Sequence, residues 1–407
     1  MIAVPETQVA CCLGGFTQRL KCFQTRALTC FFSAHGIDIL LSWILKGRAS
    51  VDEKKLQDLR QQIDGLDDQI LDLLNRRAEV VVEVGKTKDD SQGVYYVPSR
   101  EKAIFERLIT KNAGPFPSEG IRRVFREIIS ASLSLEQPLK VAFLGPQATY
   151  THVAAMRQFG LSAQLVPLKS ISSIFDEVSR GRASYGVVPV ENSNEGVVSH
   201  TLDMFMSSDL KVIAEILLPV SHDLLNLSGE ISDVRKVISH PQAIGQCRDW
   251  LEENLPEVPL VDASSTANAA QQSAEDASVA AIASEAAASL YGLRVVKNKI
   301  EDNPNNFTRF LIVGSEMQGP SGNDKTSIMF SVKDKAGVLY HMLEPFSKRD
   351  INLAKIESRP MKGKAWEYIF FLDMVGHVED QKISGALEEL KAHCQFLKVL
   401  GSYPKAK

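Results

Sequence analysis

The residues best suited to chemistry stand where a polar stretch changes abruptly into a strand-like one. Residues 301–306 form a loop-type run that contains Pro304, and residues 307–313 are rich in the β-branched and aromatic types that favour strands. Thr308 and Arg309 therefore lie at the mouth of a predicted buried strand, where α/β enzymes place ligand-binding groups. A strand with a threonine on one face and an arginine on the other, without any ligand, is the structural alternative.

A second set of candidates lies on a long helix predicted to begin near Val51. Apolar residues recur there at alternating steps of three and four, as in a coiled coil: Leu56, Leu59, Ile63, Leu66, Ile70, Leu73, Val80 and Val84. Arg77 occupies the position missing from this series, and Lys88 lies on nearly the same face. A buried arginine is costly unless an anion meets it. The two cations therefore predict an anion site, and surface cations on a solvated helix are the alternative.

Arg60 precedes Arg77 by almost five helical turns, which is roughly 25 Å along a straight helix. The two side chains cannot share a small site within one chain. A helix of this length needs a partner to bury its apolar stripe, and an antiparallel dimer would carry Arg60 to the partner's site. We therefore expect a homodimer or a higher homo-oligomer with shared sites.

Two shorter helices are predicted to complete an all-α domain over residues 51–138. Ser99 is predicted to cap the first of them, with Arg100 and Glu101 in its first turn. In the second, Ser132 and Glu136 fall on one face, a turn apart.

Strand and helix patterns alternate over residues 139–316, which predicts an α/β domain with two lobes and a cleft. Polar residues follow several of the predicted strands: Glu191, Asn192, Ser193, Ser239, His240, Gln242, Ser264, Ser265 and Thr266. As helix caps they would need no ligand. Gathered at one cleft, they would bind carboxylates.

Residues 325–404 follow the order strand, helix, strand, strand, helix, strand. This order predicts an α+β domain of the ferredoxin-like type. Gly337 begins the first helix without a side chain, so backbone amides stay open to a ligand carboxylate.

Several motifs in order carry a family resemblance. Asn306-Phe307-Thr308-Arg309-Phe310, preceded by Val188-Pro189-Val190-Glu191-Asn192-Ser193, resembles prephenate dehydratase. Glu357-Ser358-Arg359-Pro360 with the last predicted domain resembles an ACT regulatory domain, and the helical segment resembles an all-helical chorismate mutase. From about Val51 to Ala406 the chain is similar to the bacterial P-protein, a multidomain fusion of these parts.

The resemblance implies conversion of chorismate to prephenate and then to phenylpyruvate, with feedback inhibition by phenylalanine. The mutase step is a pericyclic rearrangement that needs cations and hydrogen-bond donors rather than a nucleophile or base. The implied chorismate residues are Arg60 of the partner, Arg77, Lys88, Arg100, Glu101, Ser132 and Glu136, with Arg77, Lys88 and Glu136 catalytic. Glu136 stands where some members have a glutamine that donates to the ether oxygen, so it should work only when protonated. Val97 stands where some members have an acid.

For the dehydratase step, the resemblance implies that Thr308 donates a proton to the leaving hydroxide. The implied prephenate residues are Glu191, Asn192, Ser239, Gln246 and Arg309. His240 precedes a proline, which is more typical of a structural role, and Ala148 replaces a glycine of the family's glycine-rich loop. The implied phenylalanine site lies between two ACT domains and uses Gly337, Val338, Leu339, Asn352, Leu353, Glu357, Ser358 and Arg359.

Composition limits the other possibilities. A net charge of −4 over 407 residues gives no whole-protein field for nucleic acid or an acidic membrane. Four of the six cysteines lie in the first thirty residues without a zinc spacing, and so few cysteines indicate reduced thiols in a cytoplasm. No metal, nucleotide or flavin is implied, so we expect the partners to be small molecules.

Residues 1–50 lie outside the resemblance. Their apolar run from Ile37 to Leu45 is too short to span a bilayer, and we expect the segment to be dispensable, as from a wrongly assigned start. Few acidic residues leave an organelle transit peptide as the alternative.

Two rivals to this enzyme remain. One is a non-catalytic amino-acid sensor that keeps the folds and lacks the chemistry. The other is a dehydratase that acts on arogenate, the amino analogue of prephenate.

Overall fold

A computed structural model describes residues 53–89, 96–136, 138–332, 336–360 and 368–406. By its contacts the chain separates into two compact units, Met1–Leu73 and Leu74–Lys407. The expectation for residues 1–50 lies outside the described residues. Within the described residues, no helix is long and apolar enough to cross a membrane.

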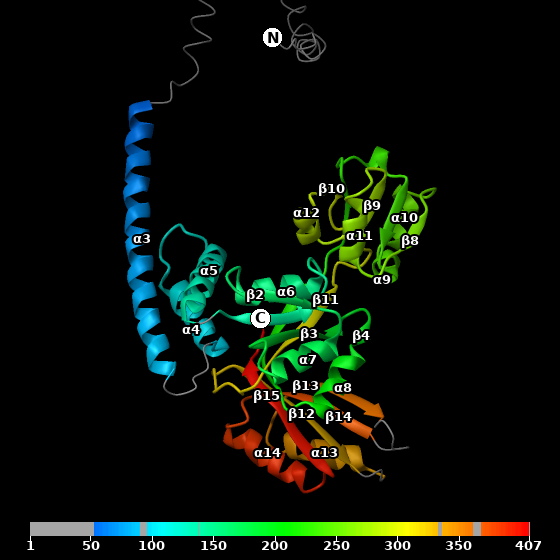
Figure 1. The fold of residues 1–407 in the computed structure, drawn as a ribbon. Helices are drawn as coiled ribbons and strands as arrows, with labels where there is room; N and C mark the ends of the chain where they lie inside the picture. Colours follow the sequence, from blue (N-terminus) through cyan, green and yellow to red (C-terminus); the bar gives the residue numbers. More distant parts are fainter. Residues whose placement is uncertain (1–52, 90–95, 137, 333–335, 361–367, 407) are drawn as a thin grey trace, which may run out of the picture. The chain divides into compact units, whose positions relative to one another are not determined.

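Within the part of the chain that the structure describes, three helices precede the first strand: α3 (Glu53–Asp89), α4 (Pro98–Lys111) and α5 (Ser118–Glu136) (Figure 1). The predicted cap of α4 at Ser99 was wrong, because the helix begins at Pro98 and Val97 occupies its N-cap position. The apolar stripe of α3 is exposed, since Ile63, Leu66, Leu73 and Val80 are each 55–59% accessible. A single helix cannot bury its own stripe, so α3 presents a face suited to another helix. α4 packs against α5, and Phe105 is buried between them under two arginines of α5.

The first sheet of the central segment is mixed and has the order β2-β1-β3-β11-β5, with β4 beside β3. Its strands are β1 (Lys140–Leu144), β2 (Gln164–Leu168), β3 (Tyr185–Asn192), β4 (Gly196–Val197), β5 (Lys211–Pro219) and β11 (Phe307–Gly314). β1 runs parallel to β2 and β3, whereas β11 runs antiparallel to β3 and β5. The sheet packs against α6 (Tyr150–Phe159), α7 (Ile171–Ser179) and α8 (Ser199–Ser207). β11 is therefore an interior strand, although it comes last in the chain among the strands of this sheet.

The second sheet has the order β10-β6-β9-β7-β8. It is formed by β6 (Asp223–Asn226), β7 (Lys236–Ser239), β8 (Leu260–Asp262), β9 (Val279–Ala283) and β10 (Arg294–Lys297), with η2 (Ile231–Asp233), α9 (Pro241–Gly245), α10 (Arg248–Asn254), α11 (Thr266–Ser273) and α12 (Glu285–Tyr291). Buried alanines such as Ala270, Ala281 and Ala287 let the helices approach this sheet closely. The chain enters the second sheet after β5 and returns to the first with β11, so the predicted two lobes are present.

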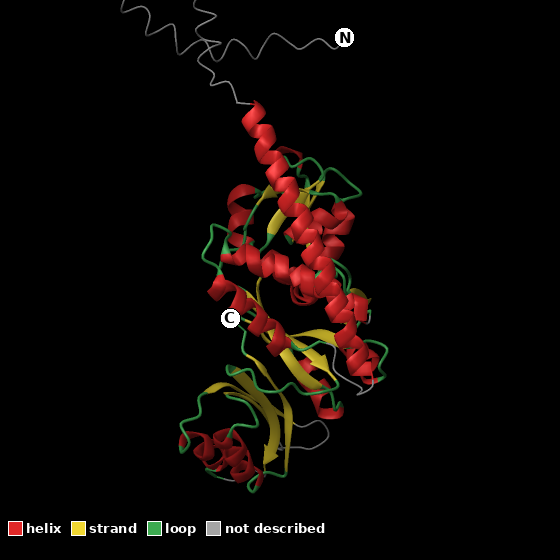
Figure 2. Ribbon diagram, turned by 90° about the vertical axis from the view of Figure 1, so that its left-hand side faces the viewer, coloured by secondary structure: helices red, strands yellow, loops and turns green. Residues whose placement is uncertain are grey.

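The C-terminal segment is a four-stranded antiparallel sheet in the order β13-β14-β12-β15. Its elements are β12 (Asp324–Val332), α13 (Val338–Ser347), β13 (Leu353–Pro360), β14 (Tyr368–Val375), α14 (Gln381–Lys391) and β15 (Phe396–Pro404). Both helices lie on one face of the sheet, over a core that includes Phe330, Phe346 and Leu390 (Figure 2). This is the ferredoxin-like arrangement predicted from the order of the elements.

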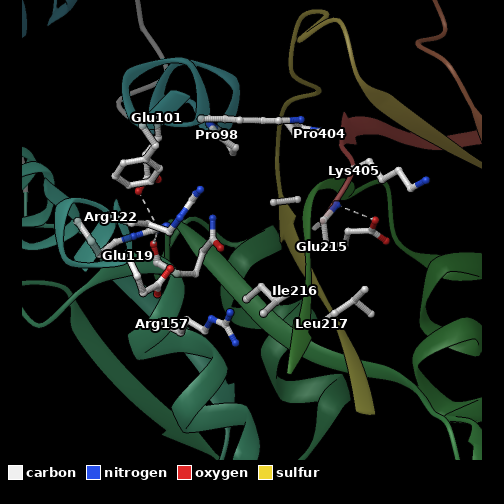
Figure 3. A pocket seen from close by; sticks show the side chains of 16 residues that line it. Pro98, Glu101, Glu119, Arg122, Arg157, Glu215, Ile216, Leu217, Pro404 and Lys405 are labelled. Carbon is white, nitrogen blue, oxygen red and sulfur yellow. Dashed lines mark hydrogen bonds and ion pairs between the residues drawn. The ribbon is translucent and has the colours of Figure 1, made fainter. Parts of the chain in front are cut away.

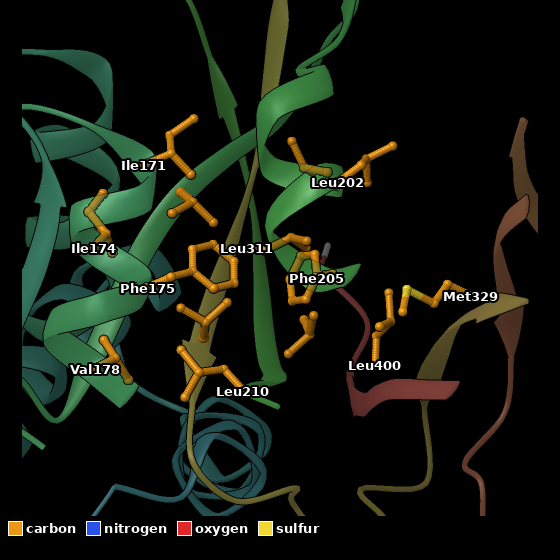
Figure 4. Packing of buried hydrophobic residues seen from close by; sticks show 14 of the residues in the cluster. Ile171, Ile174, Phe175, Val178, Leu202, Phe205, Leu210, Leu311, Met329 and Leu400 are labelled. Carbon is orange, nitrogen blue, oxygen red and sulfur yellow. The ribbon is translucent and has the colours of Figure 1, made fainter. Parts of the chain in front are cut away.

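The other face of the C-terminal sheet shares a core with the first sheet of the central segment. Phe175, Phe205 and Leu311 belong to the same buried cluster as Met329 and Leu400 (Figure 4). The backbones approach closely as well, because a Cβ on Gly401 would lie 2.1 Å from the Val212 carbonyl oxygen. We call this contact between the two sheets the seam. Because its apolar residues form one core, the two sheets support each other.

Candidate active sites

A cavity of about 550 Å³ lies between the two lobes of the central segment. Polar side chains from both lobes line it: Thr149, Tyr150, Asn192, Glu195, His222, His240, Gln242, Gln246, Ser264, Ser265, Thr266, Asn306 and Thr308. Hydroxyls, amides and imidazoles outnumber carboxylates on its wall. The cavity is therefore better suited to an anionic, oxygen-rich ligand than to a cation.

Asn192 fixes the hydrogen-bond direction at Thr308. The Asn192 Oδ1 atom accepts hydrogen bonds from the backbone N–H groups of Asn194 (2.9 Å) and Glu195 (3.0 Å), so its Nδ2 atom must point the other way. Nδ2 donates to Thr308 Oγ1 at 2.8 Å and to Asn306 Oδ1 at 2.9 Å. Since Oγ1 accepts from Asn192, the hydroxyl proton of Thr308 is left to donate to a group in the cavity.

A chain of hydrogen bonds continues from Asn306 to the second lobe. The Gln246 Oε1 atom accepts from Asn306 Nδ2 at 2.9 Å and lies 2.9 Å from His222 Nε2. Gln246 Nε2 donates to Glu195 Oε1 at 3.3 Å, which sets the orientation of the amide. Burial lowers the pKa of His222, so the ring is neutral and carries its proton on Nε2. Its Nδ1 atom lies 3.1 Å from the Tyr150 hydroxyl, which donates to the Ser221 carbonyl oxygen at 2.5 Å.

The structure places two of the expected prephenate-binding residues outside this cavity. Glu191 directly precedes the cavity residue Asn192, and Arg309 directly follows the cavity residue Thr308. Successive side chains of a strand point to opposite faces. Arg309 instead binds Glu215 and Asp373, and Glu191 binds Lys355. Both side chains therefore lie at the seam.

Ser239 is also outside the cavity, whereas its neighbour His240 lines it. Ser239 is fully buried, and its hydroxyl donates to the Ile282 carbonyl oxygen at 2.6 Å. His240 caps α9, because its Nδ1 atom accepts from the Gln242 N–H group at 3.3 Å. The contacts of His240 thus match the structural role expected for it, and Ser239 contributes to packing in the second lobe.

Two residues that line the cavity, His222 and Glu195, were not predicted from the sequence. Neither lies in a recognisable motif: Glu195 stands in the turn after β3, and His222 stands where the chain passes from the first lobe to the second. The available signal was position, because residues at a crossing between two predicted lobes lie next to the cleft.

The helical segment brings three of the expected chorismate residues together. Arg77 Nη1 donates to Ser132 Oγ, and that hydroxyl donates to the Ile128 carbonyl oxygen at 2.6 Å. Glu136 packs against α3 at Gly85, where an added Cβ would lie 3.1 Å from Glu136 Cγ. Burial lowers the pKa of Arg77 from its usual value. A partly buried cation beside a hydroxyl can bind a carboxylate.

Other expected chorismate residues are placed differently. Glu101 lines a separate cavity of about 400 Å³ with Arg122, Arg126 and Arg157 (Figure 3). Its Oε1 atom lies 2.7 Å from Arg126 Nη1, and burial raises the pKa of the carboxyl group although Arg126 opposes this.

Of the remaining members of this set, Arg60 and Arg100 are exposed. The side chain of Lys88 lies outside the described residues.

The expected phenylalanine residues lie at the start of α13 and on β13. Gly337 has a φ of +77° and caps α13 without a side chain, and Leu339 in the first turn is exposed. Along β13, Glu357 and Arg359 lie on the half-buried face and Ser358 lies on the exposed face. Among the described strands, β13 lies at the edge of its sheet.

The fold and the cavity define a helical domain followed by a two-lobed α/β enzyme and a ferredoxin-like regulatory domain. Three family models match the chain in this order: Chorismate mutase type II over residues 59–137, Prephenate dehydratase over residues 141–318, and ACT domain over residues 326–392.

Relatives share the whole arrangement. The bifunctional chorismate mutase/prephenate dehydratase of Aquifex aeolicus (strain VF5) is 50% identical over 357 residues, which cover 87% of this chain and 99% of the relative. The protein of the same name from Pseudomonas aeruginosa is 43% identical over 361 residues, with 87% and 99% covered. A structure of prephenate dehydratase from Arthrobacter aurescens in complex with L-Phe matches with a TM-score of 0.61 and 36% identity, covering 66% of this chain and 90% of that chain. The chain belongs to the family of bifunctional chorismate mutase/prephenate dehydratases.

Proposed function

We propose that Thr308 is the proton donor of the prephenate dehydratase step. In this reaction the bond between the ring and its carboxylate breaks, carbon dioxide leaves, and the electron pair enters the ring. Hydroxide departs from the opposite ring carbon and takes up a proton, which yields water and phenylpyruvate. Aromatisation drives the reaction, so the enzyme's task is to protonate the leaving group and hold the two carboxylates.

The observation that carries this proposal is the hydrogen bond from Asn192 Nδ2 to Thr308 Oγ1 at 2.8 Å. A hydroxyl that already accepts from an oriented amide has its proton free for the substrate. Among the described residues, the Thr308 hydroxyl donates to no protein acceptor. The hydroxyl is thus set up as a donor before the substrate binds, which is electrostatic preorganisation.

Histidine is a weaker candidate for the proton donor. Burial lowers the pKa of His222, so the ring is neutral at physiological pH, and its Nε2 proton is engaged by Gln246. His240 uses its Nδ1 atom to cap α9, which leaves only its Nε2 atom for a ligand. A neutral threonine hydroxyl can protonate the leaving group only if that group is already strongly basic, which departing hydroxide is.

We propose that the prephenate carboxylates bind to donors on the wall of the same cavity. The N-terminus of α11, with Ser265 as its cap and Thr266 after it, opens into the cavity, as does the N-terminus of α6 at Thr149. Helix N-termini with hydroxyl caps favour anions. Gln246 completes this set from the second lobe.

We propose that the mutase step uses Arg77, Ser132 and Glu136 with Lys88 and the partner subunit's Arg60. The contact between Arg77 and Ser132 supports this grouping. The exposed stripe of α3 supports the partner, because a second α3 in antiparallel orientation would bury it. The edge of β13 offers a second contact between copies.

We propose that phenylalanine inhibits the dehydratase by binding beside Gly337 and β13. The match to the ACT domain and the similarity to a prephenate dehydratase bound to L-Phe support this. The open amides at Gly337 would receive the carboxylate of the amino acid.

A paired assay tests the assignment of Thr308. Loss of chorismate and appearance of phenylpyruvate are measured on the same preparation of the wild type, Thr308→Ala and Thr308→Ser. We expect Thr308→Ala to make prephenate at the wild-type rate and phenylpyruvate at least about 100-fold more slowly. Thr308→Ser, which keeps a hydroxyl, should recover part of the second activity.

Undiminished dehydratase activity of Thr308→Ala would refute the assignment. A wild type that performs neither reaction but binds phenylalanine would identify the chain as an amino-acid sensor. Arogenate in place of prephenate tests the remaining rival, because a preference for arogenate would require a cavity that recognises its amino group.

A further inference from the structure

The strand pair that carries Asn192 and Thr308 has a second face, which is charged. Across the antiparallel pair of β3 and β11, Thr308 lies opposite Asn192 and Arg309 lies opposite Glu191. Asn192 and Thr308 face the cavity, whereas Glu191 and Arg309 face the C-terminal sheet. Each of these two cavity residues is thus a direct chain neighbour of a charged residue at the seam.

Arg309 binds groups from both sheets. Its Nε atom lies 2.8 Å from Glu215 Oε2 on β5, its Nη1 atom 2.6 Å from Asp373 Oδ2 on β14, and its Nη2 atom 2.9 Å from Tyr403 Oη on β15. Burial by itself would lower the pKa of Arg309, but Tyr403, Asp373 and Glu215 outweigh it and raise the pKa. Arginine is a permanent cation, and Arg309 on β11 therefore links the first sheet to the C-terminal sheet through Asp373 and Tyr403.

Glu191 has a matching contact with the next regulatory strand. Lys355 Nζ lies 2.7 Å from Glu191 Oε2, and Arg309 Nη1 lies 3.9 Å from the same oxygen. Lys355 is on β13, on the same half-buried face as Glu357 and Arg359. The strand expected to sense phenylalanine is thus in direct contact with the residue before Asn192.

These charges cannot separate freely. Three carboxylates, on Glu191, Glu215 and Asp373, meet three cations, on Arg309, Lys325 and Lys355. A shift of one sheet along the other, with the two still packed, would leave mostly buried charges such as Asp373 and Lys325 without their partners, which is unfavourable. A shift of β13 or β14 must therefore either move β3 and β11 with it or break ion pairs.

We propose that Glu191 and Arg309 are positioning residues, which hold Asn192 and Thr308 in register with the regulatory sheet through Lys355 and Asp373. The proposal rests on the proposed role of Thr308 as proton donor. It assigns the arginine beside the catalytic threonine to transmission between domains instead of substrate binding. Ligand binding at β13 would then alter the dehydratase through the geometry of the Asn192 to Thr308 hydrogen bond.

Lys355→Met in the full-length enzyme tests the proposal, with Lys398→Met as the matched control. Lys398 also crosses the seam, but its Nζ atom binds the carbonyl oxygens of Phe205 and Ser208 at the end of α8, away from Glu191 and Arg309. The two lysines are similarly covered, with side chains 17% and 22% exposed. Both variants lose one cation at the same interface, so a purely structural effect should be shared.

We expect Lys355→Met to lower the dehydratase kcat at least about fivefold with a much smaller change in KM, and to weaken inhibition by saturating phenylalanine. The mutase rate of the same preparation should stay within about twofold of the wild type, because that site lies on other elements. Lys398→Met should keep both the kcat and the response to phenylalanine. Lys355→Arg, which restores a cation, should recover most of the kcat.

A wild-type dehydratase kcat and a wild-type response to phenylalanine in Lys355→Met would overturn the proposal. An equal loss in Lys398→Met, or no rescue by Lys355→Arg, would do so too. The assay of Thr308→Ala distinguishes a failure of the proposed role of Thr308 from a failure of the proposed coupling. If Thr308→Ala stays active, the role of Thr308 has failed; if it is inactive while Lys355→Met behaves as the wild type, only the coupling has failed.

Discussion

Asn192 and Thr308 lie opposite each other in the β3–β11 pair, and the amide nitrogen of Asn192 is 2.8 Å from the hydroxyl oxygen of Thr308. The amide can point in one direction only, because its oxygen accepts two backbone N–H groups. The pair therefore determines where the proton of Thr308 can go. Asn192 was predicted to bind substrate, and its contacts indicate that it also orients the proposed proton donor.

Asn192→Asp should abolish this orientation with almost no change of shape. A carboxylate still accepts from the N–H groups of Asn194 and Glu195, but it cannot donate to Thr308 Oγ1. The Thr308 hydroxyl would then donate to the carboxylate, and its proton would no longer be available to the substrate. We expect the dehydratase kcat to fall about 100-fold or more, with an unchanged mutase rate as the internal control. A dehydratase kcat close to that of the wild type would show that the orientation of Thr308 is set by something else.

The pKa of His222 predicts how stability depends on pH. Burial lowers this pKa in the folded chain, so below about pH 6.5 the unfolded chain takes up a proton that the native chain resists. The stability contribution of the neutral ring is complete above that pH and is lost as the pH falls through the folded pKa. The loss is at most about 1.4 kcal/mol per pH unit for one proton.

Urea unfolding at about pH 8 and about pH 5.5 measures this effect. His222→Asn should lose less stability than the wild type between the two conditions, because its amide does not titrate. His200→Asn, at an exposed position of α8, is the control and should behave as the wild type. Parallel losses in the wild type and His222→Asn would contradict the prediction.

The close packing at the seam predicts that Gly401 cannot be replaced by a larger residue. A Cβ on Gly401 would lie 2.1 Å from the Val212 carbonyl oxygen, and backbone atoms on both sides leave no flexible group to move. We expect Gly401→Ala to destabilise the chain by about 3 kcal/mol or to prevent the two sheets from docking. Gly319→Ala, where nothing lies within 4 Å of the added carbon, should be neutral. Thermal unfolding of both variants makes the comparison, and equal midpoints would mean that the seam is looser than described.

The architecture could be predicted from patterns, because each segment has a clear period and order of elements. The heptad-like series of α3, the alternation of strands and helices in the centre, and the βαββαβ order at the end all correspond to elements that form. A backbone requirement can also be seen at the single residue Ala148. Ala148 stands where the resemblance implies a glycine, and its φ of +64° lies in the region that favours glycine.

The cavity could be predicted only in part. A sequence motif contains residues that are neighbours in the chain, but successive side chains of a strand point to opposite faces of the sheet. Thr308 and Asn192 reach the cavity, whereas Arg309 and Glu191 reach the seam. A similar shift of one residue occurs in the second lobe, where Ser239 was expected to bind substrate but its neighbour His240 lines the cavity. Choosing between the faces requires knowing that a third sheet covers one of them, which is a tertiary contact that no local pattern contains.

Glu136 predicts an unusual pH dependence of the mutase. An ionised carboxylate cannot donate to the ether oxygen of chorismate, so the mutase rate should fall as the pH rises. Glu136→Gln supplies a permanent donor of nearly the same shape and should flatten the profile, with its largest gain at alkaline pH. Steady-state rates from acid to alkaline pH give the comparison, with the dehydratase rate as the control for folding. A wild-type mutase that becomes more active at alkaline pH would contradict a donor role for Glu136.

Shared mutase sites predict that two inactive variants can restore each other. Arg60→Ala and Arg77→Ala should each abolish mutase activity, because every site needs Arg77 from one chain and the partner subunit's Arg60. When the two variants are mixed, unfolded and refolded together, about half of the dimers should be hybrids with one intact site each. The mixture should then recover about a quarter of the wild-type mutase activity. The dehydratase activity of each variant, which uses other elements, reports correct refolding. If that control activity returns and the mutase activity does not, Arg60 and Arg77 do not meet across the proposed dimer.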